Sequence, residues 1–153
     1  MSFLDLYTEA YNMLQLYQRG VEQPLEGGVI QEGEEFQVEF YVWNRFNEDI
    51  LEGFPKMPRI KLPSFKNVSL DIKGTACAEV AGGNQVIDFG SVGPGRISLE
   101  KVKFKALKAL ADIFGINPRE PYATVVLSAD LDLQDFLRIE KMPVTFATQI
   151  AKN

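Results

Sequence analysis

The fold class follows from residues 33–44, GEEFQVEFYVWN. Apolar side chains occupy every second position from Phe36 to Val42, and polar or large aromatic side chains fill the positions between them, from Gln37 to Trp43. Successive strand residues point to opposite faces of a sheet, so this alternation predicts a strand over residues 35–43 with one buried face. Such a strand is typical of an antiparallel sheet that covers a core on one side.

The first 21 residues predict a helix ahead of this strand. Ser2, followed three residues later by Asp5, fits a capping arrangement, and Gly20 stands where a C-terminal cap is expected. Between them, apolar residues recur at spacings of three and four over residues 3–19, at Phe3, Leu6, Ala10, Met13 and Tyr17. We expect the helix either to cover its own sheet or to dock on a partner or a second copy of the chain.

Beyond Pro24 the apolar period changes to two, which predicts a series of short strands. A hairpin is expected around Gly82-Gly83-Asn84, a turn at residues 90–95 and a long proline-containing connection at residues 45–64. Helical spacing over residues 107–114 predicts a short inserted helix near 106–114. The predicted strands are 29–30, 35–43, 67–73, 75–80, 85–89, 97–105, 122–131 and 143–150.

Three of these segments carry a family resemblance. Gly33-Glu34-Glu35-Phe36 leads into a strand that ends at Asn44, Val92-Gly93-Pro94-Gly95 introduces another strand, and Tyr122 opens a strand that runs into Asp130. In this order the chain resembles the bacterial immunoglobulin-like domains related to cell-adhesion modules, over roughly residues 29–150. The resemblance implies a binding or spacer module without catalytic residues, so it assigns no functional position.

The predicted fold is therefore mostly β: a single domain over residues 1–153, with a helix at residues 1–21 and a β-sandwich at residues 29–150. We expect an immunoglobulin-like antiparallel sandwich of seven or eight strands with the short inserted helix. A chain of 153 residues can bury such a core without metals or disulfides.

Composition excludes several classes of function. The chain has no histidine, which removes Ser-His-Asp and Cys-His catalysis and histidine-ligated zinc, and we expect no enzyme. A net charge of −5 opposes nucleic-acid binding, and no apolar run approaches the ~20 residues of a membrane helix. No secretory signal is visible, which predicts a cytoplasmic protein as the chain stands and an extracellular one if a signal was removed. Cys77, between two alanines, is expected in the core.

Asp130, Asp132 and Asp135 form the best candidate polar cluster in the chain. Asp130 and Asp132 fall on one side of a strand, and carboxylate oxygens at this spacing can hold Ca²⁺. The cluster lacks the glycine and the final glutamate of an EF-hand loop. Solvated or turn-capping aspartates explain it more simply, so no cofactor is expected, with a Ca²⁺ site as the alternative.

The long connection carries basic residues without acidic ones between Gly53 and Lys66. Its prolines favour an extended path that an aromatic groove or an acidic partner could bind, although a rigid crossover between sheets would have the same composition. The candidate partner-binding residues here are Phe54, Lys56, Arg59 and Lys61.

Tyr41 and Trp43 fall on the polar side of the first long strand. Large aromatic side chains there either mark an interface or are covered by the N-terminal helix. We therefore predict a non-enzymatic protein-interaction or structural module that binds a protein partner or a second copy of itself. The alternatives are a Ca²⁺- or carbohydrate-binding sandwich that uses the aspartate cluster, and a subunit of a larger assembly such as a phage tail or capsid.

Overall fold

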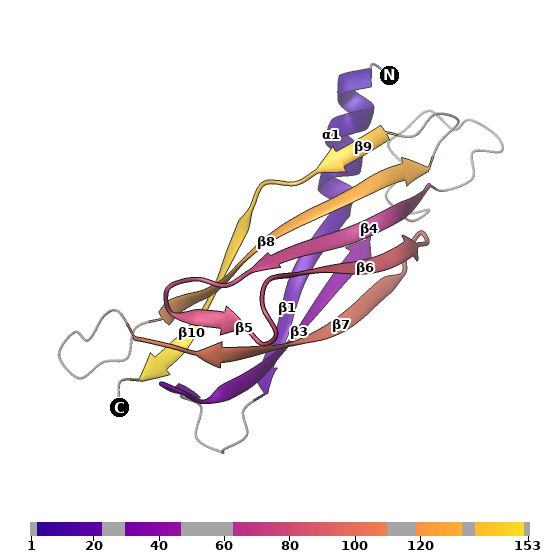
Figure 1. The fold of residues 1–153 in the computed structure, drawn as a ribbon. Helices are drawn as coiled ribbons and strands as arrows, with labels where there is room; N and C mark the ends of the chain where they lie inside the picture. Colours follow the sequence, from indigo (N-terminus) through magenta and orange to yellow (C-terminus); the bar gives the residue numbers. More distant parts are fainter. Residues whose placement is uncertain (1–2, 23–29, 47–62, 110–118, 133–136, 152–153) are drawn as a thin grey trace.

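The computed structural model describes residues 3–22, 30–46, 63–109, 119–132 and 137–151. These residues form one helix and ten strands in two sheets, and the helix projects beyond one end of the strands (Figure 1). The elements are α1 (Phe3–Met13), β1 (Leu14–Glu22), β2 (Ile30–Gln31), β3 (Glu35–Asn44), β4 (Ser64–Lys73), β5 (Ala78–Val80), β6 (Gln85–Val92), β7 (Ile97–Ala106), β8 (Arg119–Asp132), β9 (Leu137–Glu140) and β10 (Val144–Ala151).

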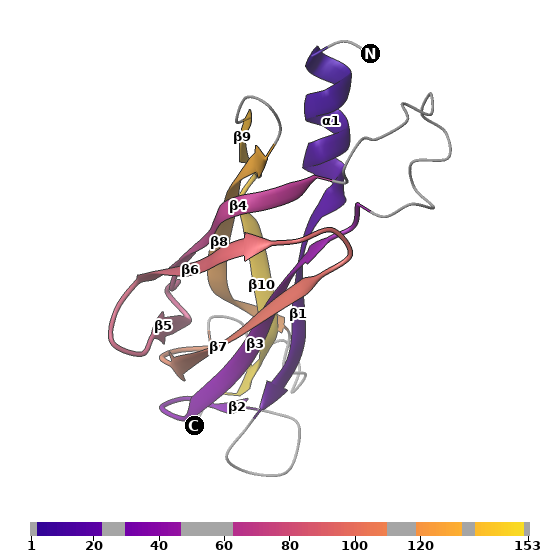
Figure 2. The ribbon, with the colours of Figure 1, turned by 90° about the vertical axis from the view of Figure 1, so that its right-hand side faces the viewer.

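The two sheets are curled and packed against each other. The four-stranded sheet has the order β1-β3-β7-β5, and all its neighbours are antiparallel. The six-stranded sheet has the order β2-β10-β8-β4-β6, with β9 pairing with the far end of β8. Figure 2 shows β6 and β7, joined by a turn, diverging into different sheets. The predicted mostly β, sandwich-like class is confirmed.

The core lies between the sheets and begins at β3, as the alternation predicted. Phe36, Val38, Phe40 and Val42 are all at most 2% exposed. The ring of Phe36 meets the ring of Tyr122, from β8, edge to face at 5.6 Å between centroids. Aromatic contacts of this kind join the two sheets into one hydrophobic core.

The predicted helix over residues 3–19 is wrong beyond Met13, because residues 14–22 form β1, which pairs with β3 in antiparallel register. At the junction the backbone N–H of Arg45 donates to the carbonyl of Met13 at 2.8 Å. The Lys141 ammonium donates to the carbonyl of Leu14 at 2.6 Å. These groups satisfy carbonyls that a continuing helix would have bonded, and the edge of β3 supplies the remaining backbone partners.

The predicted hairpin of residues 75–80 and 85–89 is also wrong. β5 pairs with β7 in the four-stranded sheet, whereas β6 pairs with β4 in the six-stranded sheet. Between them Gly82 and Gly83 have φ angles of 85° and 95°, a backbone conformation that side chains with a Cβ rarely adopt. The glycines therefore lie in a connection that crosses from one sheet to the other, and they do not form the tight turn of a hairpin.

The number of strands exceeds the seven or eight predicted. β1 was assigned to the helix, and β9 is a four-residue strand that carries no clear alternation. The predicted inserted helix near 106–114 is not helical where the structure describes it, since β7 continues to Ala106 and Leu107 N–H donates to the carbonyl of Cys77 at 2.8 Å. Its remaining residues lie outside the described ranges. Within those ranges no helix is long and apolar enough to cross a membrane.

Candidate protein-interaction surface

The four-stranded sheet has an outer face, turned away from the core, on which β3 and β7 place their side chains in matched rows. Buried residues alternate along β3, and the residues between them form this outer face. The registered pairs across it, from one end to the other, are Trp43 with Ile97, Tyr41 with Leu99, Glu39 with Lys101, Gln37 with Lys103 and Glu35 with Lys105.

One end of the outer face is apolar. We call Tyr17, Tyr41, Trp43, Ile97 and Leu99 the apolar patch. Ile97 and Leu99 are 52% and 48% exposed, which is high for aliphatic side chains. Tyr17, on β1, stacks on Tyr41 with ring centroids 5.1 Å apart. The predicted cover for Tyr41 and Trp43 was the N-terminal helix, but their aromatic neighbour is Tyr17 on a strand, and both remain partly exposed.

Each aromatic ring of the apolar patch has one face in contact with another side chain of the same chain. Tyr17 and Tyr41 lie face to face, with an interplanar angle of 22°. The guanidinium carbon of Arg45 lies 5.2 Å from the centroid of the Trp43 ring, within the range of a cation–π interaction. One face of each ring is therefore covered within the chain, and Ile97 and Leu99 add exposed aliphatic surface beside the rings.

The other end of the outer face is charged, with acidic side chains on one strand and basic side chains on the next. Glu35 and Glu39 project from β3 and form the acidic strip. Lys101, Lys103 and Lys105 project from β7, all exposed, and form the basic strip. The two strips run side by side, about 4.8 Å apart as neighbouring strands are.

The sequence matches no protein-family model and no curated protein. Among solved structures, the chain is similar to the solution structure of a protein described as a late embryogenesis abundant (LEA) protein. The two are 11% identical with a TM-score of 0.33, and the match covers 95% of this chain and 83% of that one. A likeness at this level leaves function to be argued from the geometry.

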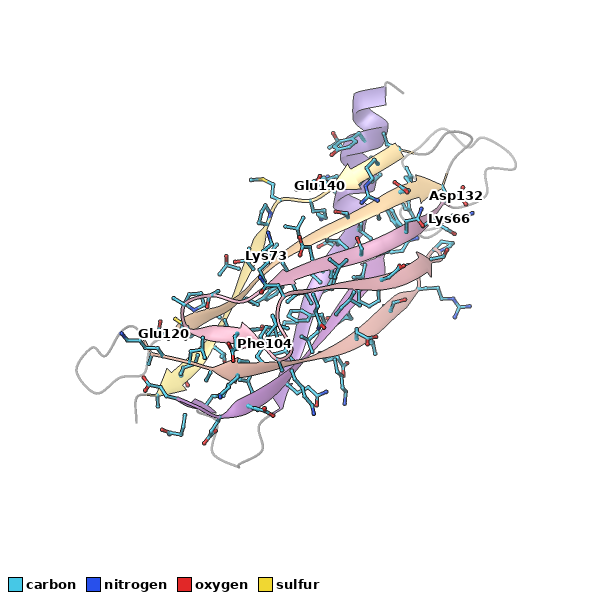
Figure 3. All side chains as sticks on the ribbon, in the orientation of Figure 1. Lys66, Lys73, Phe104, Glu120, Asp132 and Glu140 are labelled. Carbon is cyan, nitrogen blue, oxygen red and sulfur yellow. The ribbon has the colours of Figure 1, made fainter. Side chains whose placement is uncertain are left out.

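The structure places two of the three predicted metal ligands, and each is paired with a cation. Asp130 accepts a hydrogen bond from the Asn67 amide at 2.9 Å and lies 3.3 Å from the Arg138 guanidinium. Asp132 lies 3.0 Å from the Lys66 ammonium, at the adjoining ends of β8 and β4 (Figure 3). Asp130 and Asp132 therefore form side-chain contacts with residues of neighbouring strands.

Asp135 lies outside the described ranges, so the Ca²⁺ site stays a prediction. Among the residues that the structure describes, no group of three or more histidine, cysteine, aspartate or glutamate side chains is arranged to hold a metal ion. The candidate residues of the long connection, Phe54, Lys56, Arg59 and Lys61, also fall outside these ranges.

Cys77 is a core residue, as predicted, with no exposed surface. Its thiol donates to a carboxylate oxygen of Glu120 at 3.6 Å, and Glu120 is only 4% exposed. Near Cys77, a pocket of about 510 Å³ is lined by β5, including Glu79, and by the glycines at residues 82–83, between β5 and β6. This region joins the sheets, since β5 belongs to one and Glu120 to the other.

Sequence reasoning found Tyr41 and Trp43 but missed Tyr17, Ile97 and Leu99. Tyr17 was assigned to the helix. The signal for the other two was present, because Ile97 and Leu99 have the opposite parity to the buried Val102 and Phe104. Residues of opposite parity on one strand occupy opposite faces, so both aliphatic side chains could have been placed on the outer face.

Proposed function

We propose that this protein is a non-enzymatic protein-interaction module whose contact surface is the outer face of the four-stranded sheet. The observation that carries the proposal is the apolar patch, in which the exposed Ile97 and Leu99 adjoin three aromatic side chains. Contiguous apolar side chains on a face that is otherwise polar mark sites of association. Aromatic residues and arginine are enriched at the centres of such interfaces, and Arg45 lies over Trp43 here.

The ring geometry favours a protein partner over a carbohydrate. A sugar stacks its own face on an open aromatic face, and each of these rings already has one face covered, by the Tyr17–Tyr41 stack or by Arg45 over Trp43. Aliphatic and aromatic side chains of a protein can instead pack against ring edges and against Leu99. The aspartate pair proposed for the carbohydrate alternative lies in the six-stranded sheet, and both members are held by cations.

We assign the finer architecture to the immunoglobulin-like type. Its support is that two sheets of mainly antiparallel strands pack face to face over one hydrophobic core, as in immunoglobulin-like sandwiches. Sandwiches of this type carry many functions, so the architecture is compatible with a binding module without requiring one.

Site-specific photo-crosslinking in the cells that produce the protein tests the proposed function. A photoreactive phenylalanine analogue replaces Leu99 in one variant and Lys73, an exposed residue at the end of β4 in the other sheet, in the control (Figure 3). We expect a discrete protein adduct, of whatever identity, from position 99 and none from position 73. Equal labelling of proteins from both positions, or adducts from neither, would contradict the proposal.

A further inference from the structure

The charges of the outer face are arranged so that the face complements itself. The acidic strip lies on β3 and the basic strip on β7, and both strips end at the same apolar rows. Consider a second copy placed face to face by a half-turn about an axis that runs along the strands, midway between β3 and β7. That rotation keeps each row at its own height and exchanges the two strands.

Four of the five rows then meet their own complement, while the fifth brings Gln37 against Lys103 of the second copy. Glu39 faces Lys101 of the second copy, and Glu35 faces Lys105 of the second copy, because these residues are registered pairs across β3 and β7. The same rotation places Tyr41 against Leu99 of the second copy, so apolar rows meet apolar rows. Sheets that pack face to face are usually rotated by about 30°, so the match is best near the axis.

The alternative half-turn is disfavoured. An axis that crosses the strands within the interface would superpose β3 on β3 and β7 on β7, and would reverse the order of the rows. It would place the basic strip over Ile97 and Leu99, or over the basic strip of the second copy. Facing like charges and burying ammonium groups against aliphatic side chains both cost free energy, which selects the first arrangement.

The area available fits a weak dimer. Strands of ten residues at ~3.4 Å per residue give a face roughly 34 Å long, and the three long strands β1, β3 and β7 span roughly 14 Å. The resulting footprint of roughly 480 Å² on each copy is below the ~800 Å² of a standard interface and within the range of transient ones. We therefore expect a weak dimer whose population depends on the protein concentration.

We propose that the partner of the outer face is a second copy of this chain, related by a two-fold axis parallel to the strands between β3 and β7. This inference rests on the proposed function, because it uses the same face, and it adds the identity of the partner and its orientation. The interface is isologous, as in most two-fold dimers, so one charge substitution changes it at two places.

Complementary charge reversal tests this arrangement. One variant carries Lys101→Glu and Lys105→Glu, and the other carries Glu35→Lys and Glu39→Lys. Sedimentation equilibrium over a concentration series is expected to show self-association of the wild type and at least tenfold weaker self-association of either variant. An equimolar mixture of the two is expected to regain a dimer, because a largely acidic face, which keeps Lys103, then meets an all-basic one.

A matched control carries Lys73→Glu and Lys108→Glu, which change the net charge as the Lys101/Lys105 variant does, at exposed positions outside the registered rows of β3 and β7. It is expected to associate like the wild type. Leu99→Asp, on the exposed side of β7, is expected to abolish the dimer, while Val86→Asp, at a 66% exposed position on β6, is expected to leave it intact. Thermal unfolding of every variant checks that the fold persists, and Leu99→Asp still tests the interface if a double variant fails to fold.

Two outcomes overturn the inference. A wild type that stays monomeric at millimolar concentration excludes a second copy as the partner, and the crosslink from position 99 then decides whether another protein binds this face. A dimer that survives both charge reversals and Leu99→Asp lies on a different surface. Loss of crosslinks from position 99 instead contradicts the proposed function itself, so the two failures are distinguishable.

Discussion

At the scale of single residues, Asn44 contributes most clearly to cohesion between the sheets. Its side chain has no exposed surface. The amide nitrogen donates to the carbonyls of Pro63 and Val92, both at 3.1 Å, and the amide oxygen accepts from the backbone N–H of Phe46 at 3.0 Å. One side chain at the end of β3 therefore ties the chain at the entrance to β4 and at the end of β6.

Asn44→Leu is expected to lower the free energy of unfolding by about 3 kcal/mol. It removes three hydrogen bonds and leaves two carbonyls and one N–H buried without them, each at a cost of roughly 1 kcal/mol or more. Urea denaturation followed by circular dichroism measures the loss. Asn84→Ala is the control, because the exposed Asn84 side chain accepts a hydrogen bond from the Gly74 N–H at 3.1 Å, and its loss is expected to cost less than about 1 kcal/mol. Equal losses from both variants would show that burial of Asn44 is unimportant.

Tyr122 is a buried residue. Its ring packs in the core, and its hydroxyl has no hydrogen-bond partner among the described residues. The ring meets Phe104 edge to face at 5.2 Å between centroids. Tyr122→Phe keeps the ring and removes the desolvated hydroxyl, so we expect it to raise the free energy of unfolding by about 1 kcal/mol at neutral pH. Denaturant unfolding at pH 7 measures the change, and a loss above about 1 kcal/mol would mean that the hydroxyl is bonded in the folded protein.

The same residue predicts how stability changes in alkali. Burial raises the pKa of the Tyr122 hydroxyl well above its ordinary value of 10.0, and the nearby Arg119 opposes this less strongly. The folded chain thus keeps a proton that the unfolded chain loses above about pH 10, so the contribution of Tyr122 is complete below that pH and declines as the pH rises. Stability of the wild type is expected to fall more steeply than that of Tyr122→Phe above pH 10. Parallel curves would refute this assignment.

At the scale of elements, alternation predicted most strands because a half-buried sheet imposes it directly on the sequence. β3, β4, β7, β8 and β10 all overlap their predicted ranges. The N-terminal helix failed at its end because apolar residues such as Tyr17 fit a helical spacing and a strand position equally well. The edge of β3 and the cation of Lys141, 127 residues away from Leu14, decide between the two, and no local pattern contains that information.

The junction between α1 and β1 is predicted to depend on Lys141. Its ammonium donates to the carbonyl of Leu14 and lies 4.6 Å from the centroid of the Tyr11 ring. Lys141→Met keeps the aliphatic stem but removes both interactions, so we expect a loss of about 1–2 kcal/mol and faster hydrogen exchange in α1. Lys73→Met, at an exposed position on β4, is the control and is expected to leave exchange in α1 unchanged. Unaltered exchange in Lys141→Met would show that Lys141 does not hold α1 in place.

At the scale of the whole molecule, the sequence predicted the class and part of the candidate surface. Tyr41 and Trp43 could be identified because they are large aromatic residues on the side of the predicted strand that is otherwise polar. Their alignment with Leu99 and Ile97 could not be derived, because the register between β3 and β7 joins segments more than 50 residues apart. The assignment of β5 and β6 to different sheets is likewise a property of the complete topology. Local alternation fixes which face a residue occupies, whereas its neighbours on that face depend on the pairing of distant strands.

The shared core predicts that the two sheets unfold together. Phe36 and Phe104 of the four-stranded sheet both contact Tyr122 of the six-stranded sheet, at 5.6 and 5.2 Å between ring centroids. Neither sheet can separate without exposing these rings to water, so an intermediate with one sheet intact is expected to be poorly populated.

Single probes in different parts of the chain can test this cooperativity. The chain has one tryptophan and one cysteine. Trp43 reports on the outer face of the four-stranded sheet, whereas the buried thiol of Cys77 lies against Glu120 at the start of β8. In a urea series at low protein concentration, we expect the fluorescence of Trp43, the labelling of Cys77 and the far-ultraviolet circular dichroism to share one midpoint. Labelling of Cys77 at urea concentrations that leave the other two signals native would mean that β5 and the start of β8 open separately, and that the aromatic contacts do not couple this end of the sandwich to the rest.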